Sequence, residues 1–166
     1  MLVYNRIRWR GKYMLVLVQP ELKELHYRKK LLSDKKTMAF NKDNGGTVDF
    51  HEKLWVRWYD LWMNHPQYYY AYLYDEQLQC YIGEVSYYFE EDYQEYVLNI
   101  IIEERYRHLG KGKEALLLLC QKAKENGLRF LCDDIDSRNP AIDLFKKAGF
   151  KEVWQKGHIT MLKKRL

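Results

Sequence analysis

The chain has little of what marks secreted, metal-binding or membrane proteins. Its three cysteines, Cys80, Cys120 and Cys132, are odd in number and widely spaced. This spacing argues against a disulfide framework and a zinc site, so we expect reduced, mostly buried thiols and no metal. The longest apolar runs are far shorter than a membrane span, and the first residues lack the order of a secretory signal. We therefore expect a cytoplasmic protein with no membrane partner.

Basic charge is too small and too scattered to indicate a nucleic-acid partner. The sequence has 28 Lys+Arg against 23 Asp+Glu, a formal net charge of +5, and the basic residues are spread along the chain. No fixed-period repeat, low-complexity tract or composition break divides the 166 residues. We expect one domain over 1–166, with 1–12 as an extra strand or arm and Met14 as an alternative start to Met1.

The first third of the chain predicts a strand followed by two helices. An apolar strand at 13–19 leads into a helix that ends near Ser33. Asp49, with Glu52 three residues on, has the spacing of a capping box and predicts a second helix to about Asn64. Helical spacing on that helix predicts a face packed in the core, rather than a ligand-binding aromatic box, for Leu54, Trp55, Trp58, Leu61 and Trp62.

The remaining elements predict a mixed α/β fold. Three aromatic-rich segments separated by short polar turns, 68–75, 80–89 and 95–102, are typical of an antiparallel meander. A helix at 110–126, a strand at 128–135, a short helix at 139–148 and strands at 151–156 and 158–164 follow. The connection that says most about the fold is therefore the one that runs from a strand through the glycine loop and a helix to the next strand.

The segment 103–120, EERYRHLGKGKEALLLLC, begins an apolar helix at two glycines among positive charges. Each glycine costs a helix about 0.5–1 kcal/mol relative to alanine. The first free amides of a helix attract anions, and hydrogen bonds to charged groups contribute about 1.5–3 kcal/mol each, so a bound phosphate would offset that cost. The alternative is a flexible turn with a solvated basic face. The basic residues around the turn are Arg105, Arg107, His108, Lys111 and Lys113.

Two other phosphate-binding motifs fit this turn less well. A Walker A loop needs glycine five residues before Gly112 and Ser or Thr after the lysine, where this chain has Arg107 and Glu114. The dinucleotide fingerprint matches the glycine spacing at 110–115 and has aspartates about 20 residues further on. In that motif the glycines follow the strand directly, whereas 103–109 intervene here, and too little chain remains for repeated βαβ units.

Two segments together resemble the GNAT superfamily of N-acetyltransferases. RHLGKG at 107–112 resembles its Arg/Gln-x-x-Gly-x-Gly/Ala acyl-CoA pyrophosphate loop, and RNPAIDLFKKAGF at 138–150 resembles its second signature. The resemblance covers about 13–163 and implies a mixed, mostly antiparallel central sheet. That sheet would carry helices on both faces and be splayed between the fourth and fifth strands. The resemblance also implies acetyl-CoA as acyl donor and no metal.

The same resemblance implies cofactor-binding residues. The pantetheine arm would lie between the splayed strands and bond to the main chain of Ile100, Ile101 and Ile102. The pyrophosphate would lie on amides of the glycine loop, with Arg107 and nearby lysines toward the other phosphates; the loop residues are His108, Leu109, Gly110, Lys111, Gly112 and Lys113. Asn139 would contact the pantetheine and Phe145 would pack on the cofactor. From the residues alone, 100–102 is equally a buried strand, Asn139 a helix cap and Phe145 core.

The implied reaction is direct attack of a neutral amine on the thioester carbonyl, with a backbone amide stabilising the oxyanion. Glu84, Asp133 and Asp134 are our candidates for accepting the amine proton, directly or through water. The alternatives are an outward-facing carboxylate for Glu84 and, for the aspartates, loop caps or binding of a cationic substrate. Phe145 stands four residues before the closing glycine, where many members carry the tyrosine that protonates the leaving thiolate. Because phenylalanine has no proton to donate, either another group or water protonates the thiolate in this chain, or activity is low.

Acidic residues near the expected acceptor site favour a small cationic substrate, such as a polyamine or an aminoglycoside-like molecule. These residues are Glu84, Glu90, Glu91, Asp92, Asp133 and Asp134. We therefore expect acetyl transfer to a primary amine. A peptide or protein N-terminus is the alternative acceptor, and an acyl-CoA-binding regulator without catalysis is the alternative class. Homodimer formation is left open.

Overall fold

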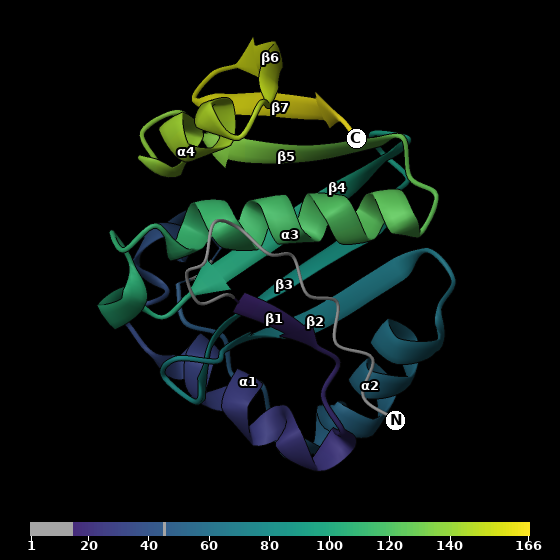
Figure 1. Ribbon diagram of the computed structural model, residues 1–166, viewed down its shortest axis with the longest axis vertical. Helices are drawn as coiled ribbons and strands as arrows, with labels where there is room; N and C mark the ends of the chain where they lie inside the picture. The colour runs from purple at the N-terminus through teal and green to yellow at the C-terminus, as the bar shows by residue number, and fades with distance from the viewer. Residues whose placement is uncertain (1–14, 45) are drawn as a thin grey trace.

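A seven-stranded sheet forms the centre of the molecule (Figure 1). The computed structural model describes residues 15–44 and 46–166, without the side chains of 42–44. The start of the expected first strand and the expected arm at 1–12 lie outside these residues. The strand order is β1-β2-β3-β4-β5-β7-β6. The strands are β1 Leu15–Val18, β2 Tyr68–Asp75, β3 Cys80–Glu90, β4 Glu95–Ile102, β5 Phe130–Asp136, β6 Lys151–Lys156 and β7 Ile159–Arg165.

The sheet is antiparallel except between β4 and β5. Those two strands run parallel and are joined by one pair of partners, Val97 and Cys132. Beyond that pair they diverge, so their later residues are not linked by sheet hydrogen bonds. The mixed, mostly antiparallel sheet with a splay between the fourth and fifth strands is therefore confirmed.

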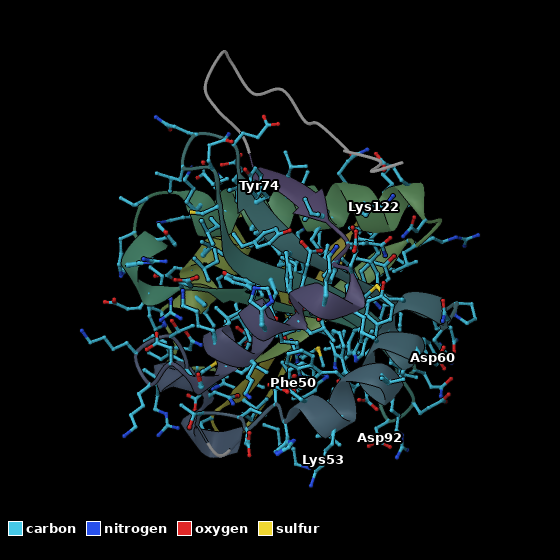
Figure 2. The ribbon with its side chains drawn as sticks, turned by 90° about the horizontal axis from the view of Figure 1, so that it is seen from below. Phe50, Lys53, Asp60, Tyr74, Asp92 and Lys122 are labelled. Carbon is cyan, nitrogen blue, oxygen red and sulfur yellow. The ribbon has the colours of Figure 1, made fainter. Side chains whose placement is uncertain are left out.

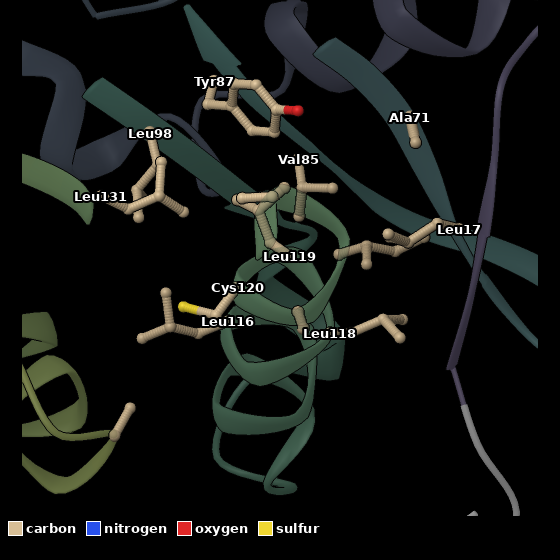
Figure 3. Close-up of a cluster of buried hydrophobic side chains, with 14 of the residues drawn as sticks. Leu17, Ala71, Val85, Tyr87, Leu98, Leu116, Leu118, Leu119, Cys120 and Leu131 are labelled. Carbon is tan, nitrogen blue, oxygen red and sulfur yellow. The ribbon is translucent and has the colours of Figure 1, made fainter. Parts of the chain in front are cut away.

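One face of the sheet is covered by α3, Lys111–Glu125, and α4, Ala141–Lys147. Figure 3 shows Leu116 and Leu119 of α3 beside side chains from three strands, Val85, Leu98 and Leu131. All five are at most 2% exposed, so the main core lies between α3 and the sheet.

The opposite face is covered by α1, Leu25–Ser33, and α2, Trp55–Asn64. Figure 2 looks from the side on which these helices lie, with Phe50 near the middle of the view. Tyr27 of α1 packs edge-on against Tyr72 of β2, with ring centroids 4.9 Å apart. Alternate residues of a strand point to opposite faces, so the tyrosines of β2 contribute to both cores. Helices on both faces of the sheet are confirmed.

Two predictions for α2 are wrong in detail. The helix is preceded by a 3-10 turn, Glu52–Leu54, whose cap is His51 and not Asp49: the His51 ring accepts a hydrogen bond from the amide of Lys53 at 3.3 Å. The expected core face is only partly buried, because the tryptophans are half-buried while Leu54 and Leu61 are 46% and 42% exposed. The packing of α2 on the sheet is concentrated on β2, so only its tryptophan side is covered.

The cysteines are free thiols in the interior. Cys120 and Cys132 are buried and Cys80 is half-buried, as predicted. Burial raises the pKa of Cys120 and of Cys132 to about 11, so these thiols are neutral and unreactive near neutral pH. Within the described ranges, no group of three His, Cys, Asp or Glu side chains is placed to hold a metal. The same ranges contain no helix long and apolar enough to cross a membrane.

Candidate active site

The glycine loop presents free main-chain amides at the start of α3. His108 and Gly110 have φ of +61° and +77°, the left-handed conformation that turns successive amides toward one side. The first main-chain bond of the helix is donated by Glu114 to Gly110 at 3.2 Å. Among the described residues, the amides of 108–113 have no main-chain acceptor. These amides and the positive end of the helix dipole form an arrangement that binds anions.

Two basic side chains near the loop are engaged in contacts within the protein. The Nε of Arg107 donates to the carbonyl of Ile102 at 3.0 Å, and one of its Nη atoms donates to the carbonyl of Thr37. Burial lowers the pKa of Arg107. The Nζ of Lys111 lies 2.6 Å from Oδ2 of Asp75. Phosphate contacts from these side chains stay a prediction, and the main-chain amides are the free donors of the loop.

The splay opens beside this loop. A Cβ added to Gly112 would lie 3.0 Å from Cδ1 of Leu144 on α4 and 3.8 Å from Cδ1 of Ile102 on β4. The first turn of α3 therefore lies between these two elements at the open end of the splay. On β4, Ile100 and Ile102 pair with β3, and only Val97 of that strand pairs with β5. The loop amides and the unpaired side of β4 fit the phosphates and the amide-containing arm of acyl-coenzyme A.

The other predicted cofactor contacts have structural roles here. The Oδ1 of Asn139 accepts a hydrogen bond from the amide of Ala141 at 2.9 Å, although the N-cap residue of α4 is Pro140 and not the predicted Asn139. Phe145 is 4% exposed, and its ring centroid lies 5.0 Å from that of Phe150. Their contacts with a cofactor stay predictions.

Glu84 lies in the interior between the sheet and α1. It is 2% exposed, forms an ion pair with Arg28 and accepts a hydrogen bond from Tyr70. The Arg28 guanidinium also lies over the rings of Trp58, at 4.7 Å, and Phe50, at 5.1 Å. An outward-facing carboxylate at this position is therefore wrong. The surroundings favour a structural ion pair, and a catalytic role for Glu84 stays a prediction.

The two predicted aspartates occupy opposite faces of β5. Asp134 is exposed and accepts a hydrogen bond from the hydroxyl of Tyr93 at 3.0 Å. Asp133 is partly buried and pairs across the sheet with Leu162, which belongs to the core under α3. Burial raises the pKa of the Asp133 carboxyl well above its usual range, and the neighbouring charge of Asp134 raises it further. The two carboxyls therefore differ in exposure and lie on opposite faces of the strand.

Asn99 is a candidate site residue that was not predicted from the sequence. This residue lies in β4, in the middle of the sheet, yet its side chain is exposed, so no helix covers the sheet at this point. Asn99 pairs with Ser86 of β3 and lies on the face that carries Asp134. Nearby on that face, burial and the charges of Glu90 and Asp134 raise the pKa of Tyr88 to about 12. The available signal was a single polar residue inside the apolar run 97–102.

Several solved structures share this fold. Spermidine N-acetyltransferase from Vibrio cholerae, solved with CoA and spermine, is 15% identical; the match covers 92% of this chain and 95% of that one, with a TM-score of 0.75. Ribosomal-protein-alanine N-acetyltransferase from Brucella melitensis is 18% identical over 90% and 99% of the two chains, with a TM-score of 0.70. An acetyltransferase from Thermus thermophilus is 21% identical over 92% and 97%, with a TM-score of 0.70.

The sequence itself also matches a family model. That model, described as the acetyltransferase (GNAT) family, matches residues 29–150, which include β4, the glycine loop, β5 and α4. No curated protein matches the chain. Because the match spans most of the 166 residues, the chain belongs to the acetyltransferase (GNAT) family.

Proposed function

We propose that the protein transfers an acetyl group from acetyl-CoA to a primary amine of a small cationic molecule. The observation that carries this proposal is the uncovered part of the sheet around Asn99, which adjoins the splay and has the Asp134 carboxylate on the same face. A substrate amine that lies there would be next to an acyl group held between β4 and β5.

The donor site in this proposal combines the loop and the splay. The amides of 108–113 would bind the pyrophosphate, and the main chain of 100–102 would bond to the pantetheine arm. Bound acetyl-CoA would supply the activated acyl group as a thioester. Membership of the GNAT family supports this donor.

The acceptor side is acidic and aromatic. Tyr93 donates to the exposed carboxylate of Asp134, and Tyr88 lies in the field of both Asp134 and Glu90. Trp62 packs edge-on against Tyr88 with ring centroids 6.0 Å apart, and both are half-buried. Carboxylates and the faces of aromatic rings both attract ammonium groups. These neighbours support a cationic amine over a neutral one.

Asp134 is our choice for accepting the proton of the attacking amine, directly or through a water molecule. It is exposed on the acceptor face, whereas Glu84 already neutralises Arg28 in the interior. In the reaction, a C–N bond forms, the C–S bond breaks, the amine loses a proton and the sulfur gains one. A thiol with a pKa near 8.5 is a good leaving group, so the first proton transfer is the more demanding one.

Thiol release from acetyl-CoA tests the proposal against a panel of amines. The panel contains a linear polyamine, an aminoglycoside, a neutral primary amine and a peptide with a free N-terminus. We expect the fastest release with a polycationic amine, and a rise in KM of about tenfold in Asp134→Asn, equivalent to about 1.4 kcal/mol of lost attraction. Asp49→Asn, which changes an exposed carboxylate in the loop before α2, is the matched control.

The panel also separates the alternatives. Release with the peptide alone would replace the small amine by a peptide or protein N-terminus as the acceptor; the name of the Brucella protein gives a protein acceptor for that enzyme. Binding of acetyl-CoA without release to any acceptor would favour the non-catalytic regulator, for which Phe145 is the supporting observation.

A further inference from the structure

Asp133 interrupts the apolar face of β5. Its neighbours on the same face, Leu131 and Ile135, are 0% and 6% exposed, and its partner across the sheet, Leu162, is 0% exposed. Because alternate strand residues share a face, position 133 belongs to the side covered by α3 and α4. Asp133 itself is only partly buried, so a carboxyl group interrupts an otherwise apolar face at a place that solvent still reaches.

The fold does little to compensate for this carboxyl. Among residues 15–44 and 46–166, no side chain forms an ion pair or a hydrogen bond with it, and the amide of Asp134 is its one favourable neighbour. The high pKa keeps the group neutral over a wider pH range than an ordinary aspartate. Asp133 is thus a carboxyl with a raised pKa and no side-chain partner among the described residues, on an otherwise apolar face of the sheet.

Its position along the strand places it at the closed end of the splay. Cys132 is the residue of β5 that pairs with Val97 of β4, and Asp133 follows it directly. The glycine loop lies at the other, open end, beside Leu144 and Ile102. A linear cofactor arm with its phosphates on the loop would extend from there toward the closed end of the splay, where Asp133 lies.

We propose that Asp133 is the catalytic acid that donates a proton to the leaving thiolate. This inference rests on the proposed function. The position where the resemblance expects a tyrosine is Phe145, which has no proton to give, and it lies on the same face of the sheet as Asp133. As the C–S bond breaks, the proton of Asp133 passes to sulfur, and the aspartate regains a proton from solvent after the products leave.

The alternation of β5 separates the two proton transfers. Asp134 faces the acceptor side and takes the proton of the amine, while Asp133 faces the α3 side and supplies one to sulfur. Two adjacent residues of one strand thereby act on the two sides of the thioester carbonyl: Asp134 on the attacking amine and Asp133 on the leaving sulfur. Environment sets their roles, since the carboxyl of Asp134 is exposed whereas that of Asp133 is partly buried on an apolar face.

Kinetics of Asp133→Asn and Asp133→Leu test the proposal. We expect kcat to fall about tenfold to a hundredfold, at the low end of general acid catalysis because a thiolate leaves readily. Acetyl-CoA affinity, measured by calorimetric titration, should change less than twofold. The decline of the wild-type rate at high pH, caused by ionisation of Asp133, should disappear in both variants. Adding Phe145→Tyr to Asp133→Leu should restore part of the lost rate, because a phenol then occupies the usual donor position.

A spectroscopic measurement tests the same group without turnover. In protein with 13C-labelled aspartate carboxyls, the resonance that Asp133→Asn removes should titrate above the ordinary range and should shift when CoA binds. The resonance that Asp49→Asn removes should not shift when CoA binds. An ordinary titration for Asp133, or unchanged kcat and pH profile in Asp133→Asn, would overturn the proposal. Wild-type protein that releases no thiol with any amine would instead overturn the proposed function and this inference with it.

Discussion

Replacing Gly83 by alanine should lower the free energy of unfolding, because the main chain of β4 occupies the place of the added Cβ. A Cβ added there would lie 2.2 Å from the main-chain oxygen of Ile101 and 3.0 Å from Cα of Ile102. Contacts of Cβ below 3.0 Å essentially never occur, so β4 would have to move by at least 0.8 Å in Gly83→Ala. The obstacle is backbone and cannot rotate away. We expect a cost at the upper end of overpacking, about 3 kcal/mol.

Only a small stabilising effect opposes the steric cost of Gly83→Ala. Gly83 does not have a left-handed φ, so alanine gains about 0.4–1 kcal/mol from the reduced entropy of the unfolded chain. The net loss is then about 2–3 kcal/mol, or roughly 5–10 °C in Tm for a domain of this size. Because Ile101 and Ile102 belong to the predicted pantetheine site, acetyl-CoA affinity should fall as well.

Thermal and urea unfolding of Gly83→Ala measure this cost, with Gly157→Ala as the matched control. Gly157 has φ +59° and no atom within 4 Å of its added Cβ, so only the left-handed conformation is penalised, by about 1–2 kcal/mol. A Gly83→Ala protein as stable as wild type would refute the close approach of β3 and β4 on which the geometry of the splay rests.

Three further predictions concern buried groups. Glu84→Gln should destabilise the fold by about 3 kcal/mol in urea unfolding, because the charge of Arg28 stays buried without its partner, while Glu104→Gln at an exposed site should be nearly neutral. Asn139→Ala should cost about 1 kcal/mol for the lost hydrogen bond from the amide of Ala141; an unchanged acetyl-CoA Kd would then argue against its predicted pantetheine contact. Because the pKa of Asp133 is raised, the folded state binds the proton of this carboxyl more tightly than the unfolded state does. The resulting contribution to the free energy of unfolding is fully present below about pH 4 and is lost as pH rises through the folded pKa. Urea unfolding of Asp133→Asn, measured across pH, should not show this loss of stability.

The order of elements could be predicted because local patterns were strong. The strands β2 and β4 have the predicted bounds, since aromatic and β-branched residues fill them and polar turns separate them. The glycine loop was found because its glycines and positive charges conflict with an ordinary helix start. Gly110 does have the left-handed φ that such a turn requires.

The environments of single side chains could not be predicted, because they depend on partners far along the chain. Glu84 is neutralised by Arg28, which lies 56 residues earlier, so its burial had no local signal. Asn99 is exposed because the helices leave the middle of the sheet uncovered, which no strand pattern records. The cap at His51 replaced the expected Asp49 because a 3-10 turn begins the helix later than the capping-box spacing implied.

Calorimetric titration with acetyl-CoA tests the central claim, that the loop at 108–113 binds the phosphates of the acyl donor. The wild-type protein is compared with a variant that carries Gly110→Val and Gly112→Val, and circular dichroism verifies that the variant is folded. We predict saturable binding by wild type and at least a tenfold weaker affinity in the variant, a loss of about 1.4 kcal/mol or more. Equal affinity of the two proteins, or no binding by wild type, would contradict the claim.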